Sequence, residues 1–194
     1  MTNNFDTIAA FLKAQQEPGT FYQVQVIKRR KENPDMAKAQ EVIKVYYVND
    51  AEYLLKKQLR IANICKAVNA RAYINLNKRS YEKTAIQMIK YLADAVYNKQ
   101  HEICKHAFDK VAGRNAADTD KKWILDVDTK SLDLVKDVLA LVAEQKPIGN
   151  KLYFVNPTPN GFHIICKPFD PRALKATYPD VEIKKDNPTI LYAL

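Results

Sequence analysis

Two aspartates stand one residue apart at the end of an apolar run, in the segment KKWILDVDTKS at residues 121–131. Side chains alternate along an extended strand, so Asp126 and Asp128 point to the same side and Trp123 points to the other. Like charges held side by side raise the pKa of at least one carboxyl group unless a cation lies between them. The pair therefore indicates either a solvated strand end, with Asp128 capping the following helix, or a site that holds a cation.

Further residues that could do chemistry follow toward the C-terminus. His163 stands in the strand-like segment GFHIICK, and Lys167 shares its face by alternation. Asp186 stands in KKDNPTILY, and Glu182 shares the face of Asp186 by the same alternation. Carboxylate oxygens are the ligands that hard divalent cations prefer. Three carboxylates that converge beside an imidazole would therefore form a metal site.

The elements that must position these residues follow the order β-α-β-β-α-β over residues 121–194. The predicted strands are KWILDVD, KLYFVNP, FHIICKPF and VEIKKDNPTILYAL, and the predicted helices are TKSLDLVKDVLALVAEQ and DPRALKATYP. This order is typical of ferredoxin-like and RNA-recognition folds, in which the first and third strands are central neighbours and the fourth flanks the first. It predicts that Asp126 and Asp128 lie beside His163 on one side and near Asp186 on the other. The last strand is interrupted near Pro188.

Residues 1–115 predict a separate N-terminal lobe of mixed α/β structure, with the boundary in AGRNAADTD. Helical spacing runs over residues 5–15, 50–68 and 81 to about 111, and FYQVQVIKR pairs with EVIKVYYVN as a hairpin. The strand ARAYINLNKRS carries one polar face, which meets either water or a ligand. The candidates for contacts to a nucleic-acid backbone are Arg71, Asn75, Asn77, Lys78 and Arg79, together with Arg29 and Arg30.

The composition narrows the class of protein. A formal charge of +9 and an isoelectric point near 9.3 favour an acidic partner, most simply nucleic acid. Cys65, Cys104 and Cys166 are widely spaced, which indicates neither a zinc site nor a disulfide framework and favours a reducing compartment. The N-terminus lacks the pattern of a signal peptide, and no stretch approaches the ~18 apolar residues of a membrane span. We expect a cytoplasmic protein with no membrane partner.

Three segments of the sequence resemble the motifs of a known family. WILDVD resembles the first motif of the archaeo-eukaryotic primase superfamily, TPNGFHII the second and KKDNPTILY the third, and they occur in the order of that family. The resemblance covers residues 121–194 and the N-terminal lobe in outline, with no attached helicase domain or zinc-binding element. It implies an α+β protein with an RRM-like or ferredoxin-like βαββαβ catalytic core packed against the N-terminal lobe.

The resemblance also implies a chemistry. A primase-polymerase of this family would hold two Mg²⁺ or Mn²⁺ ions on Asp126, Asp128 and Asp186, with Glu182 as the alternative to Asp186. His163 would contact the incoming triphosphate, and Lys167 would add a cation. The expected partners are nucleoside triphosphates, single-stranded DNA or a primer-template, and a separately encoded helicase, in the replication system of a mobile element.

Three other functions remain open from the sequence. A nonenzymatic RRM-like module binds nucleic acid through exposed rings on its central strands. Trp123 and Phe162 are predicted on the face opposite to Asp126, which makes that module a poorer match. A metal-dependent nuclease would use the same carboxylates. A degenerate member would keep the fold without activity.

Overall fold

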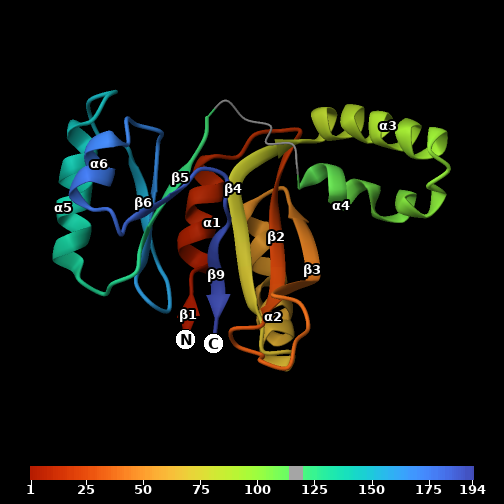
Figure 1. Ribbon diagram of the computed structural model, residues 1–194, viewed down its shortest axis with the longest axis horizontal. Helices are drawn as coiled ribbons and strands as arrows, with labels where there is room; N and C mark the ends of the chain where they lie inside the picture. The colour runs from red at the N-terminus through yellow and green to blue at the C-terminus, as the bar shows by residue number, and fades with distance from the viewer. Residues whose placement is uncertain (114–119) are drawn as a thin grey trace.

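The computed structural model describes residues 1–113 and 120–194 (Figure 1). Within these residues the strands form two antiparallel sheets, one with the order β1-β9-β4-β2-β3 and one with the order β6-β7-β5-β8. Helices pack on both sheets, so the protein has the expected α+β class. The helix α1 lies between the two sheets in Figure 1.

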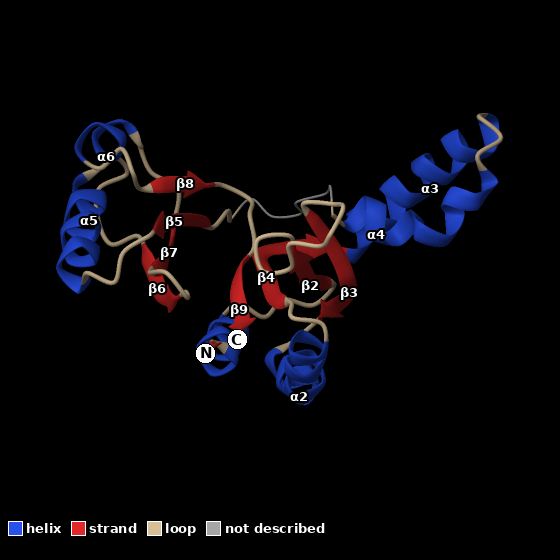
Figure 2. Cartoon of the chain, turned by 60° about the horizontal axis from the view of Figure 1, so that its bottom comes forward, coloured by secondary structure: helices blue, strands red, loops and turns tan. Residues whose placement is uncertain are grey.

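The larger sheet is built mainly by the N-terminal part of the chain. Its strands are β1 (Thr2–Asn3), β2 (Thr20–Arg29), β3 (Gln40–Val48), β4 (Arg71–Ser80) and β9 (Thr189–Ala193), and its helices are α1 (Phe5–Ala14) and α2 (Ala51–Ala67). The strands β2 and β3 pair antiparallel, which confirms the predicted hairpin. Both helices lie on one face of this sheet, as Figure 2 shows for α2.

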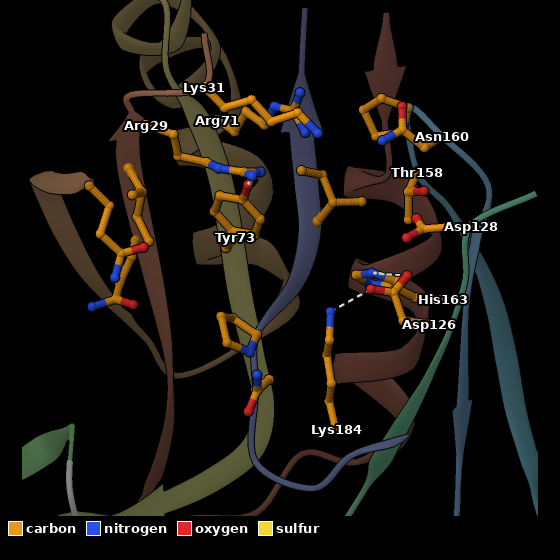
Figure 3. A pocket seen from close by; sticks show the side chains of 17 residues that line it. Arg29, Lys31, Arg71, Tyr73, Asp126, Asp128, Thr158, Asn160, His163 and Lys184 are labelled. Carbon is orange, nitrogen blue, oxygen red and sulfur yellow. Dashed lines mark hydrogen bonds and ion pairs between the residues drawn. The ribbon is translucent and has the colours of Figure 1, made fainter. Parts of the chain in front are cut away.

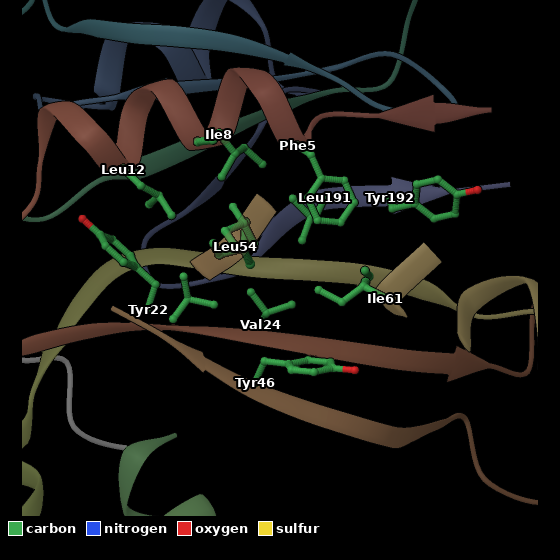
Figure 4. Close-up of a cluster of buried hydrophobic side chains, with 14 of the residues drawn as sticks. Phe5, Ile8, Leu12, Tyr22, Val24, Tyr46, Leu54, Ile61, Leu191 and Tyr192 are labelled. Atoms are coloured by element: carbon green, nitrogen blue, oxygen red, sulfur yellow. The ribbon is translucent and has the colours of Figure 1, made fainter. Parts of the chain in front are cut away.

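The main core lies between this face and the two helices (Figure 4). Alternation along β2 directs Tyr22, Val24 and Val26 to one side, where they are buried with Leu12 of α1 and Leu54 of α2. The opposite side of β2 and β4 carries polar side chains and is not covered by these helices. The larger sheet thus has one apolar face and one polar face that remains available to line a site.

The smaller sheet contains β5 (Trp123–Val127), β6 (Leu152–Pro157), β7 (Phe162–Cys166) and β8 (Glu182–Lys184), and its helices are α5 (Leu132–Glu144) and α6 (Arg172–Thr177). Leu125 and Ile164 on one face are buried against Val138 of α5. Ile124 and Ile165 on the other face join the main core. The face that carries Asp126 therefore looks toward the larger sheet.

The predicted last strand is in fact two strands in different sheets. The strand β8 pairs with β5, whereas β9 lies between β1 and β4 in the larger sheet. The chain crosses between the sheets at residues 185–188, where Pro188 cannot donate a ladder hydrogen bond. Residues 189–193 thus pair with strands of the N-terminal lobe, although the sequence placed them in the C-terminal core.

The predicted long helix over residues 81 to about 111 is wrong, because it consists of three pieces. These are α3 (Tyr81–Tyr97), the 3₁₀ helix η1 (His101–His106) and α4 (Ala107–Ala112). Lys99 has a φ of 56°, outside the right-handed helical region, and it separates α3 from η1. The pieces fold back on each other and project from the larger sheet (Figures 1 and 2). No helix in the described part of the chain has the length and apolar character that crossing a membrane requires.

Candidate functional site

A cleft of about 540 Å³ separates the polar face of the larger sheet from the smaller sheet (Figure 3). Arg29, Arg71 and Tyr73 line it from β2 and β4. Asp126 and His163 line it from β5 and β7. Residues that are far apart in the sequence therefore meet across one cleft, with carboxylates on one wall and guanidinium groups on the other.

Asp126 occupies the centre of the acidic wall. The strand pairing places it directly opposite His163 on β7 and directly opposite Glu182 on β8. His163 Nε2 lies 3.3 Å from Asp126 Oδ1. Lys184 Nζ forms an ion pair with Asp126 Oδ2 and lies 3.3 Å from Glu182 Oε2. An ammonium group thus lies within ion-pair distance of both carboxylates.

The surroundings of Asp126 keep it ionised. Burial alone would raise the pKa of its carboxyl group, but the hydrogen bonds from His163 and Lys184 and the electrostatic interactions with these two residues outweigh burial and lower the pKa to about 2. Its side chain is 14% exposed, on the side that faces the cleft. Asp126 therefore presents a negative charge to the cleft at any pH near neutrality.

The ring of His163 is held from behind by the other sheet. Its Nδ1 atom is hydrogen-bonded to Thr189 Oγ1 of β9 at 2.8 Å, and Asn156 Nδ2 of β6 donates to the same oxygen at 2.7 Å. The side chains of Asn156 and Thr189 are buried. This chain of contacts fixes the imidazole so that Nε2 points to Asp126 and the cleft.

Asp128 follows β5 and lines the same cleft beside Thr158 and Asn160 of the turn before β7. Gly161 ends this turn, and a Cβ atom at Gly161 would lie only 2.0 Å from the backbone oxygen of Val127. A larger residue would push the turn away from the end of β5, so glycine is required here for the close approach. The glycine of the second motif is therefore required because the turn packs against the backbone on either side of Asp128.

Asp186 is placed elsewhere, in contrast to its predicted position beside Asp126. Its Oδ1 atom accepts hydrogen bonds from Asn75 Nδ2 at 3.2 Å and from Asn77 Nδ2 at 2.9 Å, and its Oδ2 atom lies 3.5 Å from Arg79 Nη1. Asn77 also binds the backbone of Lys122. The physical reason is that β8 ends at Lys184, so strand alternation no longer governs Asp186. We name Asp186, Asn75, Asn77 and Arg79 the inter-sheet seam.

Five of the seven predicted nucleic-acid contacts fall into two groups. Arg29 and Arg71 line the cleft, where Arg29 Nη1 donates to Tyr73 Oη at 3.1 Å and Arg71 Nη2 lies 2.8 Å from Glu32 Oε1. Asn75, Asn77 and Arg79 belong to the seam, which joins the sheets from within.

The remaining predicted cations lie away from the cleft wall. Lys78 forms an ion pair with Glu17 at 2.6 Å. Arg30 is exposed in the turn after β2. Lys167 follows the far end of β7, where its Nζ atom lies 6.0 Å from the ring centroid of Tyr153. The prediction that Lys167 accompanies His163 therefore does not match this placement, because Lys167 follows Cys166 at one end of β7, whereas the cleft is lined by His163 and the turn at the other end.

Two residues with clear roles here were missed from the sequence. Lys184 alternates with Glu182 along one strand, so its position on the face of Asp126 was available from the pattern. Thr189 had no such signal, because it reaches His163 from the other sheet. Among the described residues, no three His, Cys, Asp or Glu side chains form a ready-made metal cluster.

No protein-family model, no curated protein and no solved structure matches this chain.

Proposed function

We propose that this protein is a primase-polymerase-like nucleotidyltransferase whose reaction takes place at Asp126 and Asp128. The observation that carries the proposal is the cleft itself, in which Asp126 and His163 face Arg29 and Arg71. A nucleoside triphosphate needs cations against its phosphates, and phosphoryl transfer needs positioning and charge neutralisation more than it needs a covalent nucleophile. This cleft offers positive charge for the phosphates and side chains that can position the substrate.

The topology of the smaller sheet supports the finer assignment to an RRM-like catalytic core. Its strand order, β6-β7-β5-β8, puts the first and third strands of the βαββαβ unit at the centre and the fourth beside the first. Its helices α5 and α6 pack on the face opposite to Asp126. The part of the other face that carries Asp126 and His163 is thereby left to line the cleft.

The carboxylate oxygens of the acidic wall are suitable ligands for a divalent cation. Lys184 Nζ already bridges the carboxylates of Asp126 and Glu182, so a cation is accommodated between these two oxygens. Mg²⁺ or Mn²⁺ would be held by Asp126, Asp128 and Glu182, with Glu182 in the role that the sequence assigned to Asp186. Such ions, when bound, activate an attacking hydroxyl group and stabilise the leaving pyrophosphate.

The other residues of the cleft bind and orient the substrate. His163, held by Thr189, directs Nε2 toward Asp126 and the cleft, and this N–H would pass from the carboxylate to a phosphate oxygen when a triphosphate binds. Arg29, Lys31 and Arg71 supply positive charge on the facing wall. Arg29 and Arg71 are already positioned by Tyr73 and Glu32, so little ordering is needed when an anion binds.

The test is incorporation of labelled nucleotides on primed and unprimed single-stranded DNA, with Mg²⁺ or Mn²⁺. We expect incorporation by the parent protein and its loss in Asp126→Asn. The matched control is Asp133→Asn, which removes an exposed carboxylate of α5 that pairs with Lys136 at the surface. Equal incorporation by Asp126→Asn and the parent, or none by the parent with either metal, contradicts the proposal.

The same assay separates the alternative functions. Degradation of the DNA by the parent but not by Asp126→Asn would indicate a metal-dependent nuclease, since the same carboxylates can activate water. Tight binding of RNA that is indifferent to metal and to Asp126→Asn would indicate a binding module without catalysis.

A further inference from the structure

A row of exposed apolar side chains runs along α3, the helix that projects from the larger sheet (Figure 2). The members of this α3 row are Ala85, Ile86, Ile89, Ala93, Val96 and Tyr97. Their spacing places them on one side of a helix. The opposite side holds Thr84 and Ala95, the buried residues of α3, and the helix packs against η1 and α4. The α3 row therefore faces away from the rest of the projection.

The apolar area that the α3 row exposes is comparable to half of a protein interface. The exposed fraction is 47% for Ile86, 68% for Ile89, 58% for Val96 and 87% for Tyr97. Together these side chains expose about 500 Å², which is the size of the largest, often functional, apolar patch on a monomer. Two copies that cover each other here would bury about 1,000 Å² of mainly apolar surface before the flanking residues are counted. Specific interfaces bury about 1,200–2,000 Å² in total, of which somewhat more than half is apolar.

The order of the side chains along the row is symmetric, which fits pairing with a second copy. Residues 85 and 97, 86 and 96, and 89 and 93 are equally far from residue 91 in the sequence. If two copies pack α3 antiparallel across a twofold axis at residue 91, Ile86 of each copy therefore faces Val96 of the other. Ile89 likewise faces Ala93, whose small side chain leaves room for it. A twofold interface requires this kind of self-complementary surface.

The charges beside the row fit the same arrangement. Lys90 and Asp94 are exposed and lie one helical turn apart on the same flank of the row. The twofold axis of an antiparallel pair sets this flank against the same flank of the other copy. Lys90 then lies beside Asp94 of the other copy, with an offset of about 3 Å along the helix axis. A parallel pair would set this flank against the opposite one, so these charges would not meet.

We infer that the α3 row is the contact surface of a homodimer in which the two α3 helices pack antiparallel around residue 91. The helix α3 and the smaller sheet lie at opposite ends of the molecule in Figures 1 and 2. Both clefts therefore remain open in the dimer. The inference goes beyond the proposed function and does not depend on the chemistry at Asp126. A lipid surface and a different protein are the other occupants that the experiments separate.

The first experiment measures the mass of the full chain by sedimentation equilibrium over a series of concentrations. Interfaces of about this size have micromolar or tighter affinities, so we expect a dissociation constant of about 10 µM or less for the parent dimer. Ile89→Glu places two carboxylates in the interface and should raise this constant by at least about 100-fold. The matched control is Leu59→Glu in α2, because Leu59 is 73% exposed and lies outside the α3 row. This control should dimerise like the parent.

The second experiment tests the antiparallel direction. Lys90→Asp and Asp94→Lys each place like charges at both contacts of the dimer, so each variant alone should dimerise about tenfold more weakly than the parent. In an equimolar mixture, the heterodimer has opposite charges at both contacts and should form about as tightly as the parent dimer. A mixture that dimerises no more tightly than the separate variants would overturn the antiparallel arrangement.

The remaining outcomes decide the occupant of the α3 row. A parent dimer that Ile89→Glu leaves intact, or a parent that stays monomeric, would overturn the inference. A monomeric parent that binds vesicles of anionic lipid, with loss of binding in Ile89→Glu, would assign the row to a lipid surface. A monomeric parent that does not bind vesicles would assign it to a different protein. All substituted side chains of the row and of the control are exposed, and circular dichroism checks that each variant keeps the helix content of the parent.

Discussion

Asp126 and Asp186 are two carboxylates with different surroundings. Asp126 lies on the wall of the cleft with His163 and Lys184, whereas Asp186 lies in the inter-sheet seam with Asn77 and Arg79. Asp186 is the more exposed of the two, at 43% against 14%. The difference teaches that the exposure of a carboxylate says less about its surroundings than its partners do.

The partners differ in what they allow. The partners of Asp186 come from β4 in the larger sheet, and Arg79 is 2% exposed, so Asp186 neutralises a buried charge. The cation beside Asp126 is the end of a flexible lysine, 22% exposed, on the short strand β8. A metal ion would therefore displace Lys184 from Asp126 much more easily than Arg79 from Asp186.

The largest expected effect comes from Asp126→Asn. We expect nucleotide incorporation to fall by about 10²- to 10³-fold, the range for loss of one group that stabilises transition-state charge. The free energy of unfolding should change by only about 1 kcal/mol, since a partly exposed ion pair is lost. Steady-state incorporation and urea unfolding measure the two effects. A stability loss without an activity loss would reverse the comparison.

Asp186→Ala should show the opposite pattern. Arg79 would keep its buried charge without this carboxylate, and the amides of Asn75 and Asn77 would each lose an acceptor, so we expect a loss of about 2 to 3 kcal/mol in the free energy of unfolding. Incorporation by the folded protein at low temperature should stay within about threefold of the parent. Abolished incorporation with unchanged stability would indicate that Asp186, and not Glu182, is the third metal ligand.

Lys184→Gln sharpens the comparison at the level of the cation. If the ammonium group occupies the position of a divalent ion, its removal should tighten Mn²⁺ binding by about fivefold, which corresponds to about 1 kcal/mol for the displaced ion pair. Lys185→Gln is the control, because Lys185 Nζ lies 4.9 Å from the ring centroid of Trp123 on the other face of the sheet. Titration of free Mn²⁺ by electron paramagnetic resonance gives the affinities. Weaker Mn²⁺ binding by Lys184→Gln would contradict this role.

The smallest expected effect concerns the thiols. Burial raises the pKa of Cys65 to about 11 and that of Cys166 to about 12, whereas Cys104 is exposed. At pH 8 an alkylating reagent should therefore modify Cys104 first. Asp186→Ala should speed the modification of Cys65 and Cys166, one in each core, and Asp126→Asn should not. Mass spectrometry over time measures these rates. Equal rates of Cys65 and Cys166 modification in both variants would contradict a stabilising role for the inter-sheet seam.

The meeting of Asp126 and His163 could be predicted because it depends on the strand order of one βαββαβ unit. Both residues lie on adjacent strands of one βαββαβ unit, and alternation with a fixed strand order places them on one face. The position of Asp186 could not be predicted, because the chain leaves the sheet after Lys184. Pro188 indicated an interruption, but no local pattern says which sheet a strand joins afterwards.

The wall of the cleft that carries Arg29 and Arg71 could likewise be predicted only in part. Alternation in β4 separated Arg71 and Tyr73 from the apolar residues of that strand, and both line the cleft. The same alternation also grouped Asn75 and Asn77 with them, although these two face Lys122 and Asp186 instead. The pattern of a strand predicts the face on which each residue lies. It does not predict whether that part of the face lines the cleft or contacts the smaller sheet.

The position of β9 has a consequence for how the protein is made. During synthesis, residues 121–184 leave the ribosome before residues 189–193, so the smaller sheet has all of its strands while the larger one still lacks β9, which lies between β1 and β4. Thr189, which holds the ring of His163, arrives with that last strand. A nascent chain therefore carries the paired strands of Asp126 and His163 first, and acquires an oriented histidine only when both sheets are closed.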